Sequence, residues 1–125
     1  MKACKVKNHE KIASKLGRFE INNNAMYNLI TKYLADYYGI PYLTLMVGRK
    51  KEVALKRQTI QYFLTIFTTY TYAEIGYLTG LRDHASINNS IKVIDNEMEI
   101  YAIFKVEIDS IYKGIEKLIM NQINE

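Results

Sequence analysis

Four consecutive residues, Asp83-His84-Ala85-Ser86, begin three positions after Gly80 and carry groups that can read the edges of base pairs. Asp83 can accept a hydrogen bond from the amino group of cytosine, and His84 can donate or accept one. Ser86 can do either or contact a phosphate, and the methyl group of Ala85 can pack on that of thymine. In the simpler alternative, Asp83 only caps a helix and His84 is an exposed polar residue.

A second group of candidate residues is basic and lies upstream, at Arg49, Lys50, Lys51, Lys56 and Arg57. The 125-residue chain has a net charge of only +4, and its acidic residues collect towards the end. A local basic cluster in a nearly balanced protein indicates a surface that faces a polyanion. A solvated basic turn that aids solubility explains the charge pattern equally well.

Other combinations of residues that support chemistry are lacking. Cys4 and His9 form one pair and His84 is isolated in sequence, whereas a zinc site needs three or four ligands. Glu97 and Glu99 lie on different faces of a helix, so they do not form a catalytic carboxylate pair. No Gly-x-x-x-x-Gly-Lys-Ser/Thr loop is present. We therefore expect that the protein is not an enzyme and that it binds no metal ion, cofactor or nucleotide.

The secondary structure that carries these residues is expected to be helical, because apolar residues recur with three-four spacing and rarely alternate with polar ones. We expect an all-α protein with helices over residues 24–38, 55–70 and 72–79, and another that begins at residue 82 or 83. After the first helix, Gly39 permits a left-handed turn and Pro41 prevents continuation. Residues 42–47 are expected to form a turn.

The third and fourth helices meet at a short corner that contains Gly80. Thr71 and Glu74 have the spacing of a capping box, which predicts where the third helix begins. Two helices joined in this way are typical of a helix-turn-helix. Since any helical bundle contains such corners, the pattern alone is weak evidence.

Beyond Lys92 the apolar residues follow a heptad-like seam with one skip. Its members are Ile94, Met98, Tyr101, Phe104, Ile108, Ile111, Ile115 and Leu118. We favour one or two terminal helices that pack on the rest of the chain, because the seam is short and interrupted. A homodimer through the C-terminal helix is the alternative.

Three separated segments resemble the C-terminal DNA-binding domain of the bacterial replication initiator DnaA. The first segment reads Glu-Ile-Gly at residues 74–76 and then Gly-Leu-Arg-Asp-His-Ala-Ser-Ile at residues 80–87, which resembles the family's helix, turn and start of the reading helix. Residues 34–40 and 56–58 resemble its first helix and the end of its basic loop. The matches are in register over residues 24–98. The resemblance implies a helix-turn-helix bundle of the DnaA domain IV, Trp-repressor-like type with an added C-terminal helix.

The resemblance also implies a role for each candidate residue. Asp83 and His84 match positions that read bases in the major groove, and Arg49 matches an arginine that enters the minor groove, where shape and potential are sensed. Arg57 and Gln58 match positions that hold the DNA backbone. Lys50 and Lys51 would neutralise phosphates. The expected DNA-binding residues are Arg49, Lys50, Lys51, Arg57, Gln58, Asp83, His84, Ala85 and Ser86.

The chain departs from the family at several of these positions. Ala85 replaces a threonine, and Tyr72 and Ala73 replace a leucine-proline pair that touches DNA. Asn89 stands where a histidine is frequent, and Glu52 interrupts the basic loop. These changes argue against recognition of the standard initiator box and leave duplex binding in place.

We therefore divide the chain into a basic N-terminal segment (1–22), a helix-turn-helix domain (23–98) and a C-terminal helical extension (99–125). No signal peptide or membrane-spanning stretch is evident, and the single cysteine, Cys4, indicates a cytoplasmic setting. The expected function is duplex DNA binding in replication or transcription regulation. The alternative is a protein-interaction module that keeps the fold without reading bases.

Overall fold

The computed structural model describes residues 22–123, and that part of the chain is a bundle of six helices without strands. The helices are α2 (Asn23–Tyr38), α3 (Tyr42–Val47), α4 (Lys51–Phe67), α5 (Tyr72–Leu78), α6 (His84–Ile100) and α7 (Ala102–Ile123). The predicted all-α class is confirmed. The basic segment predicted at residues 1–22 lies outside the described residues except for its last one.

Helix α2 begins and ends on the signals expected from the sequence. The side chain of Asn22 accepts a hydrogen bond from the backbone N–H of Ala25 at 2.8 Å, which caps the first turn. At the other end Gly39 has φ 66°, the left-handed conformation that glycine adopts at little cost. These two residues fix the length of α2, whose buried face includes Met26, Ile30 and Leu34.

The turn predicted at residues 42–47 is wrong, because this segment is the short helix α3. Pro41 lies two residues beyond the C-cap of α2 and is the N-cap of α3, where a fixed φ and a missing N–H are harmless. Leu45 and Met46 are buried in the common core. Six residues are too few to show helical periodicity in sequence, so tertiary packing decided this element.

Helix α4 is the centre of the bundle, since every residue from 59 to 67 is buried. A helix that is buried on all sides needs neighbours around it, and α2, α3, α5 and α6 all pack against it. It begins four residues earlier than predicted, with Val53 buried in its first turn, and ends three residues earlier. The end falls at Phe67 because Thr68 adopts an extended conformation (φ −124°).

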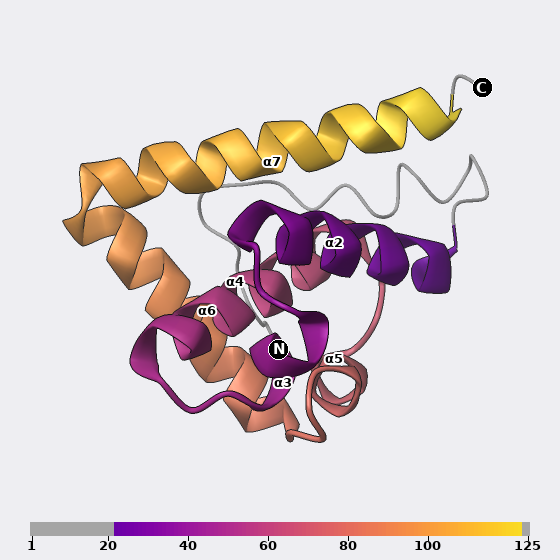
Figure 1. The fold of residues 1–125 in the computed structure, drawn as a ribbon. Coiled ribbons are helices and arrows are strands. Elements are labelled where there is room, and N and C mark those ends of the chain that lie inside the picture. The colour runs from indigo at the N-terminus through magenta and orange to yellow at the C-terminus, as the bar shows by residue number, and fades with distance from the viewer. Residues whose placement is uncertain (1–21, 124–125) are drawn as a thin grey trace.

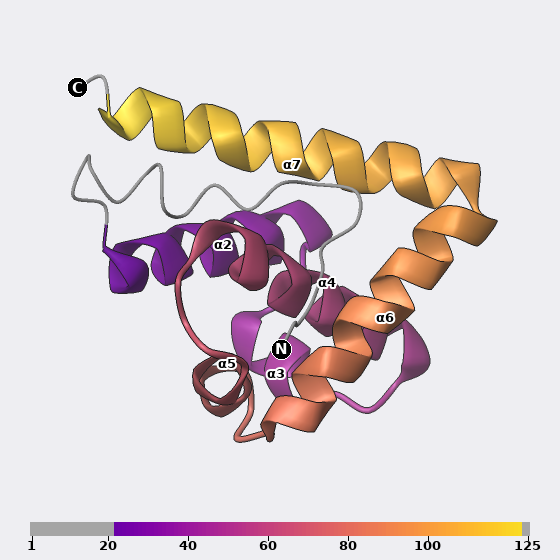
Figure 2. The ribbon, with the colours of Figure 1, turned by 180° about the vertical axis from the view of Figure 1, so that it is seen from behind.

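The chain reverses direction sharply between α6 and α7, and α7 then runs back beside α2 (Figures 1 and 2). Tyr101 forms this elbow with extended backbone, which explains the skip in the predicted seam. Most seam residues are buried within the chain, namely Ile94, Met98, Ile108, Ile111 and Ile115. Intramolecular packing is therefore confirmed, and the homodimer stays a prediction.

Across residues 22–123 no helix combines the length and apolarity needed to cross a bilayer.

Candidate nucleic-acid interface

The corner between α5 and α6 begins with the predicted capping box. The Thr71 side chain accepts the backbone N–H of Glu74 at 3.1 Å, and the Glu74 carboxylate accepts the N–H of Thr71 at 2.7 Å. Each of these two residues thus uses its side chain to accept the backbone N–H of the other, so two otherwise unpaired donors at the start of α5 have partners. This reciprocal pair determines where the first helix of the corner starts.

Two glycines allow the start of α6 to approach α5 closely. A Cβ on Gly76 would lie 2.2 Å from the carbonyl oxygen of Arg82, whose own N–H donates to the Gly76 carbonyl at 2.8 Å. Gly80 has φ 107°, a conformation that side-chain-bearing residues rarely adopt. The tight turn before α6 therefore depends on the absence of side chains at both positions.

The first turn of α6 is exposed, which leaves it accessible to a ligand. Asp83 caps the helix, with Oδ1 accepting the N–H of Ser86 at 3.0 Å. The hydrogen bonds from the backbone and side chain of Ser86, and to a smaller degree His84, hold the pKa of Asp83 below its usual value. His84 and Ala85 are exposed and Ser86 is half-buried. The helix-cap interpretation of Asp83 is confirmed, and base reading stays a prediction.

The basic loop occupies residues 48–50, between α3 and α4. Arg49 and Lys50 are exposed there, and Lys51 is exposed at the start of α4. In Figure 1 this loop and the start of α6 both lie at the lower end of the molecule, at the opposite end from α7. The loop carries Arg49 and Lys50, and the first turn of α6 carries the predicted residues Asp83 to Ser86, so both predicted groups lie at the same end of the bundle.

Arg57 and Gln58, on the second turn of α4, are half-buried. Nη1 of Arg57 donates to the carbonyl oxygens of Leu45 at 3.0 Å and Gly48 at 2.9 Å. Burial and, to a smaller degree, the nearby charge of Arg82 lower the pKa of Arg57. Nη1 of Arg57 is thus already used in hydrogen bonds within the protein. The contact of Arg57 with the DNA backbone stays a prediction.

A buried polar network that the sequence did not predict joins α4, α5 and α6. Gln61 donates through Nε2 to the Thr79 hydroxyl at 2.9 Å and accepts at Oε1 from the Ser90 hydroxyl at 2.5 Å. Because buried polar groups need partners, this arrangement favours one alignment of the corner on α4. The detectable signal was a glutamine between Ile60 and Tyr62 within a buried helix.

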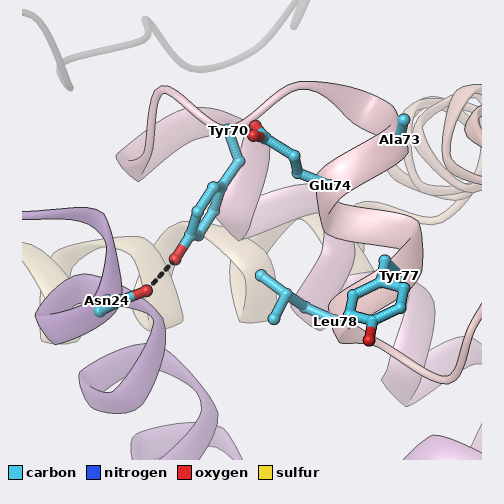
Figure 3. Close-up of a pocket in the computed structure, with 6 residues that line it drawn as sticks. All are labelled: Asn24, Tyr70, Ala73, Glu74, Tyr77 and Leu78. Carbon is cyan, nitrogen blue, oxygen red and sulfur yellow. Dashed lines mark hydrogen bonds between the residues drawn. The ribbon is translucent and has the colours of Figure 1, made fainter.

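An open pocket of about 350 Å³ lies beside α5, near the start of α2 (Figure 3). The Tyr70 hydroxyl donates to Oδ1 of Asn24 at 2.6 Å across it, which ties α2 to the segment before α5. Tyr77 and Leu78 line the other side. The carboxylate at the wall, Glu74, already accepts the hydrogen bond of the capping box.

Over the described residues no group of three or more histidine, cysteine, aspartate or glutamate side chains is placed to bind a metal ion. The capped corner, the exposed start of its second helix and the basic loop define a helix-turn-helix protein.

Comparison with known proteins narrows this class to one family. The model of the bacterial DnaA protein helix-turn-helix matches residues 27–94, more than half of the chain, and the chain belongs to this family. The chain is similar to the chromosomal replication initiator protein DnaA of Flavobacterium psychrophilum (32% identity, 69% of this chain, 18% of the relative). It is also similar to the protein of the same name from Thermus thermophilus (37% identity, 56% of this chain, 16% of the relative).

The chain spans only 15% to 22% of the length of the curated relatives that it matches. The matched region covers the helix-turn-helix and the basic loop. No solved structure gives a significant match to the chain.

Proposed function

We propose that this chain binds duplex DNA, with the first turn of α6 in the major groove and the loop of residues 48–50 in the minor groove. One observation carries the proposal: the exposed start of α6 and the exposed basic loop lie together at one end of a helix-turn-helix bundle. An α-helix fits the major groove, and the residues at its N-terminal end reach the base edges.

In the major groove the reading residues are Asp83, His84, Ala85 and Ser86. Capping and base reading by Asp83 are compatible, because an ionised carboxylate has about four acceptor sites and the cap occupies one oxygen. His84 supplies a donor or an acceptor to a neighbouring base. Ala85 offers its methyl group to thymine, and Ser86 contacts a base or a phosphate.

In the minor groove the side chain of Arg49 senses groove width and potential. Lys50 and Lys51 neutralise phosphates, which adds affinity but little sequence preference. Gln58 and the remaining donors of Arg57 approach the DNA backbone. With both base contacts and backbone contacts on one face, the protein would bind duplex DNA in general and prefer some sequences over others.

The process served is inferred from the relatives, whose name is chromosomal replication initiator protein. We infer that the chain acts at a DNA site in replication or in transcription regulation. Its departures from the family, such as Ala85 and Glu52, favour a target other than the standard initiator box.

The test begins with selection of bound duplexes from a random library, followed by affinity measurements on the selected duplex over a range of salt. We expect His84→Ala to weaken binding by about 1–3 kcal/mol and to relax selection at one base position. Lys50→Ala should weaken binding to all duplexes alike and reduce the salt slope by about one. Lys113→Ala, an exposed substitution on α7, is the matched control and should change neither.

Negligible affinity for any duplex at low salt would disprove DNA binding and leave the protein-interaction module as the better description. If binding is present but neither Arg49→Ala nor His84→Ala changes it, the fold assignment holds and the residue assignment is wrong.

A further inference from the structure

Two arginines converge on the carboxyl end of α3. Nη1 of Arg57 donates to the carbonyl oxygens of Leu45 and Gly48, as described above. Nη1 of Arg82 donates to the carbonyl oxygen of Met46 at 3.0 Å. The last carbonyls of a helix lack partners within it and carry partial negative charge. Since α3 has no basic residue in its own last turn, these arginines supply the missing donors.

Arg82 is held at both its backbone and its side chain. Its N–H donates to the Gly76 carbonyl, and the same Nη1 that bonds Met46 also donates to the Thr79 carbonyl at the end of α5. A Cβ on Gly80 would lie 1.8 Å from this Nη1, so the guanidinium group occupies the space that a side chain at residue 80 would need. Three hydrogen bonds therefore hold Arg82 in place, although it lies in a surface turn.

The two ends of this bridge are the two proposed DNA-contacting segments. Arg82 immediately precedes Asp83, the cap of the reading helix, and its acceptor on Met46 lies three residues before Arg49. Only residues 48–50 separate α3 from α4, so the loop has little freedom once α3 is held. Since the acceptors are neutral carbonyls, the positive charges of both arginines remain and add to the potential that attracts phosphates.

We propose that Arg82 is a positioning residue that sets the basic loop relative to the reading helix, so that Arg49 and the first turn of α6 engage adjacent grooves of one duplex. This inference rests on the proposed function. In this role Arg82 makes no contact with a base or a phosphate. It affects binding by fixing the position of Arg49.

The bridge itself is tested without DNA, by amide hydrogen exchange of the full chain with Arg82→Met. The Gly48 N–H bonds to the Thr44 carbonyl at 2.7 Å and reports on the end of α3. We expect it to exchange about tenfold faster in the variant, while the amide of Leu34 in α2 stays as in the wild type. Lys113→Met, which removes one positive charge from α7, should leave Gly48 unchanged. Wild-type exchange at Gly48 in Arg82→Met would overturn the proposal.

The consequence for binding is tested with a double-mutant cycle on the selected duplex. We expect Arg49→Ala to weaken binding about tenfold in the wild type and less than about threefold in the Arg82→Met background, because the loop is already misplaced there. Equal factors in the two backgrounds would mean that the residues act independently, which overturns the positioning role.

The failure of this inference and that of the proposed function are distinguishable. A wild-type chain that binds no duplex disproves the function, while the hydrogen-exchange result still reports on the bridge. Faster exchange at Gly48 together with additive effects on binding would mean that the bridge stabilises α3 without positioning Arg49.

Discussion

Among single residues, the turn before α6 combines an unusual backbone conformation at Leu81 with two charged neighbours, Arg82 and Asp83. Leu81 has φ 60° and is 76% exposed, so a bulky residue adopts a left-handed conformation at the surface. This conformation costs about 1–2 kcal/mol for a residue with a Cβ. The bonds of its neighbours Arg82 and Asp83 hold the turn in place despite this strain.

The cap formed by Asp83 leads to a pH dependence whose sign follows from its lowered pKa. A carboxyl with a depressed pKa in the folded state stabilises the fold fully above its unfolded value of 3.8, and this stabilisation is lost as the pH falls through the folded pKa. We therefore expect the chemical shift of the Ser86 amide to titrate with a midpoint below pH 3.8 in an NMR experiment.

Asp83→Asn is the control for this titration, since its side-chain oxygen still accepts a hydrogen bond but does not ionise. The Ser86 amide of this variant should show no titration step in the same range. A carboxyl of Asp83 that titrates at or above 3.8 would contradict the role of the cap in lowering its pKa.

At the scale of elements, two helical glycines have different surroundings. Gly76 in α5 is buried against the backbone of Arg82, which cannot move without shifting the start of α6. Gly114 in α7 faces the side chain of Tyr33 on α2, and the nearest atom is the hydroxyl at the far end of a ring that can move. The same substitution should therefore have different consequences in the two helices.

We expect Gly76→Ala to lower the free energy of unfolding by about 1–3 kcal/mol, because the new methyl group overpacks a rigid contact. Gly114→Ala should stay within about 1 kcal/mol of the wild type, since the gain in helix propensity offsets the displacement of Tyr33. Urea denaturation of both variants measures the difference. Equal values for the two would show that α6 can shift away from α5 freely.

At the scale of the whole molecule, α7 belongs to the same core as the helix-turn-helix. Ile108, Ile111, Ile115 and Ile119 are buried in one cluster with residues of α2, α4 and α6. The boundary predicted between residues 98 and 99 falls inside α6, which continues to Ile100. The described residues thus form one hydrophobic core, and the C-terminal helix closes it at the end opposite the proposed DNA face (Figure 1).

This arrangement predicts that the helix-turn-helix loses stability when α7 is damaged at its inner face. Ile111→Ala should lower the free energy of unfolding by about 2–5 kcal/mol, because Ile111 is 1% exposed and its truncation leaves a cavity. Ile103→Ala, the same change at an 86% exposed position of the same helix, should stay within about 0.5 kcal/mol. A change in Ile111→Ala as small as that in Ile103→Ala would mean that α7 is dispensable for the fold.

Features that depend on contacts between neighbouring residues could be predicted from the amino-acid sequence. Three-four periodicity identified the long helices, and the left-handed Gly39 and the capping box of Thr71 and Glu74 identified helix ends, because each is a contact within a few residues. The seam after Lys92 was correctly interpreted as packing within the chain. The sequence also located the exposed turn that opens with Asp83.

Tertiary packing established the features that join segments far apart in the chain. It made a helix of residues 42–47 by burying Leu45 and Met46, and it turned the side chain of Arg82 towards α3. Residues 46 and 82 are separated by 36 positions, so no local pattern reveals their hydrogen bond. Whether a segment forms a helix depends largely on its own residues. Which donor pairs with an unpaired carbonyl at a helix end depends on the side chains that tertiary packing brings close to it.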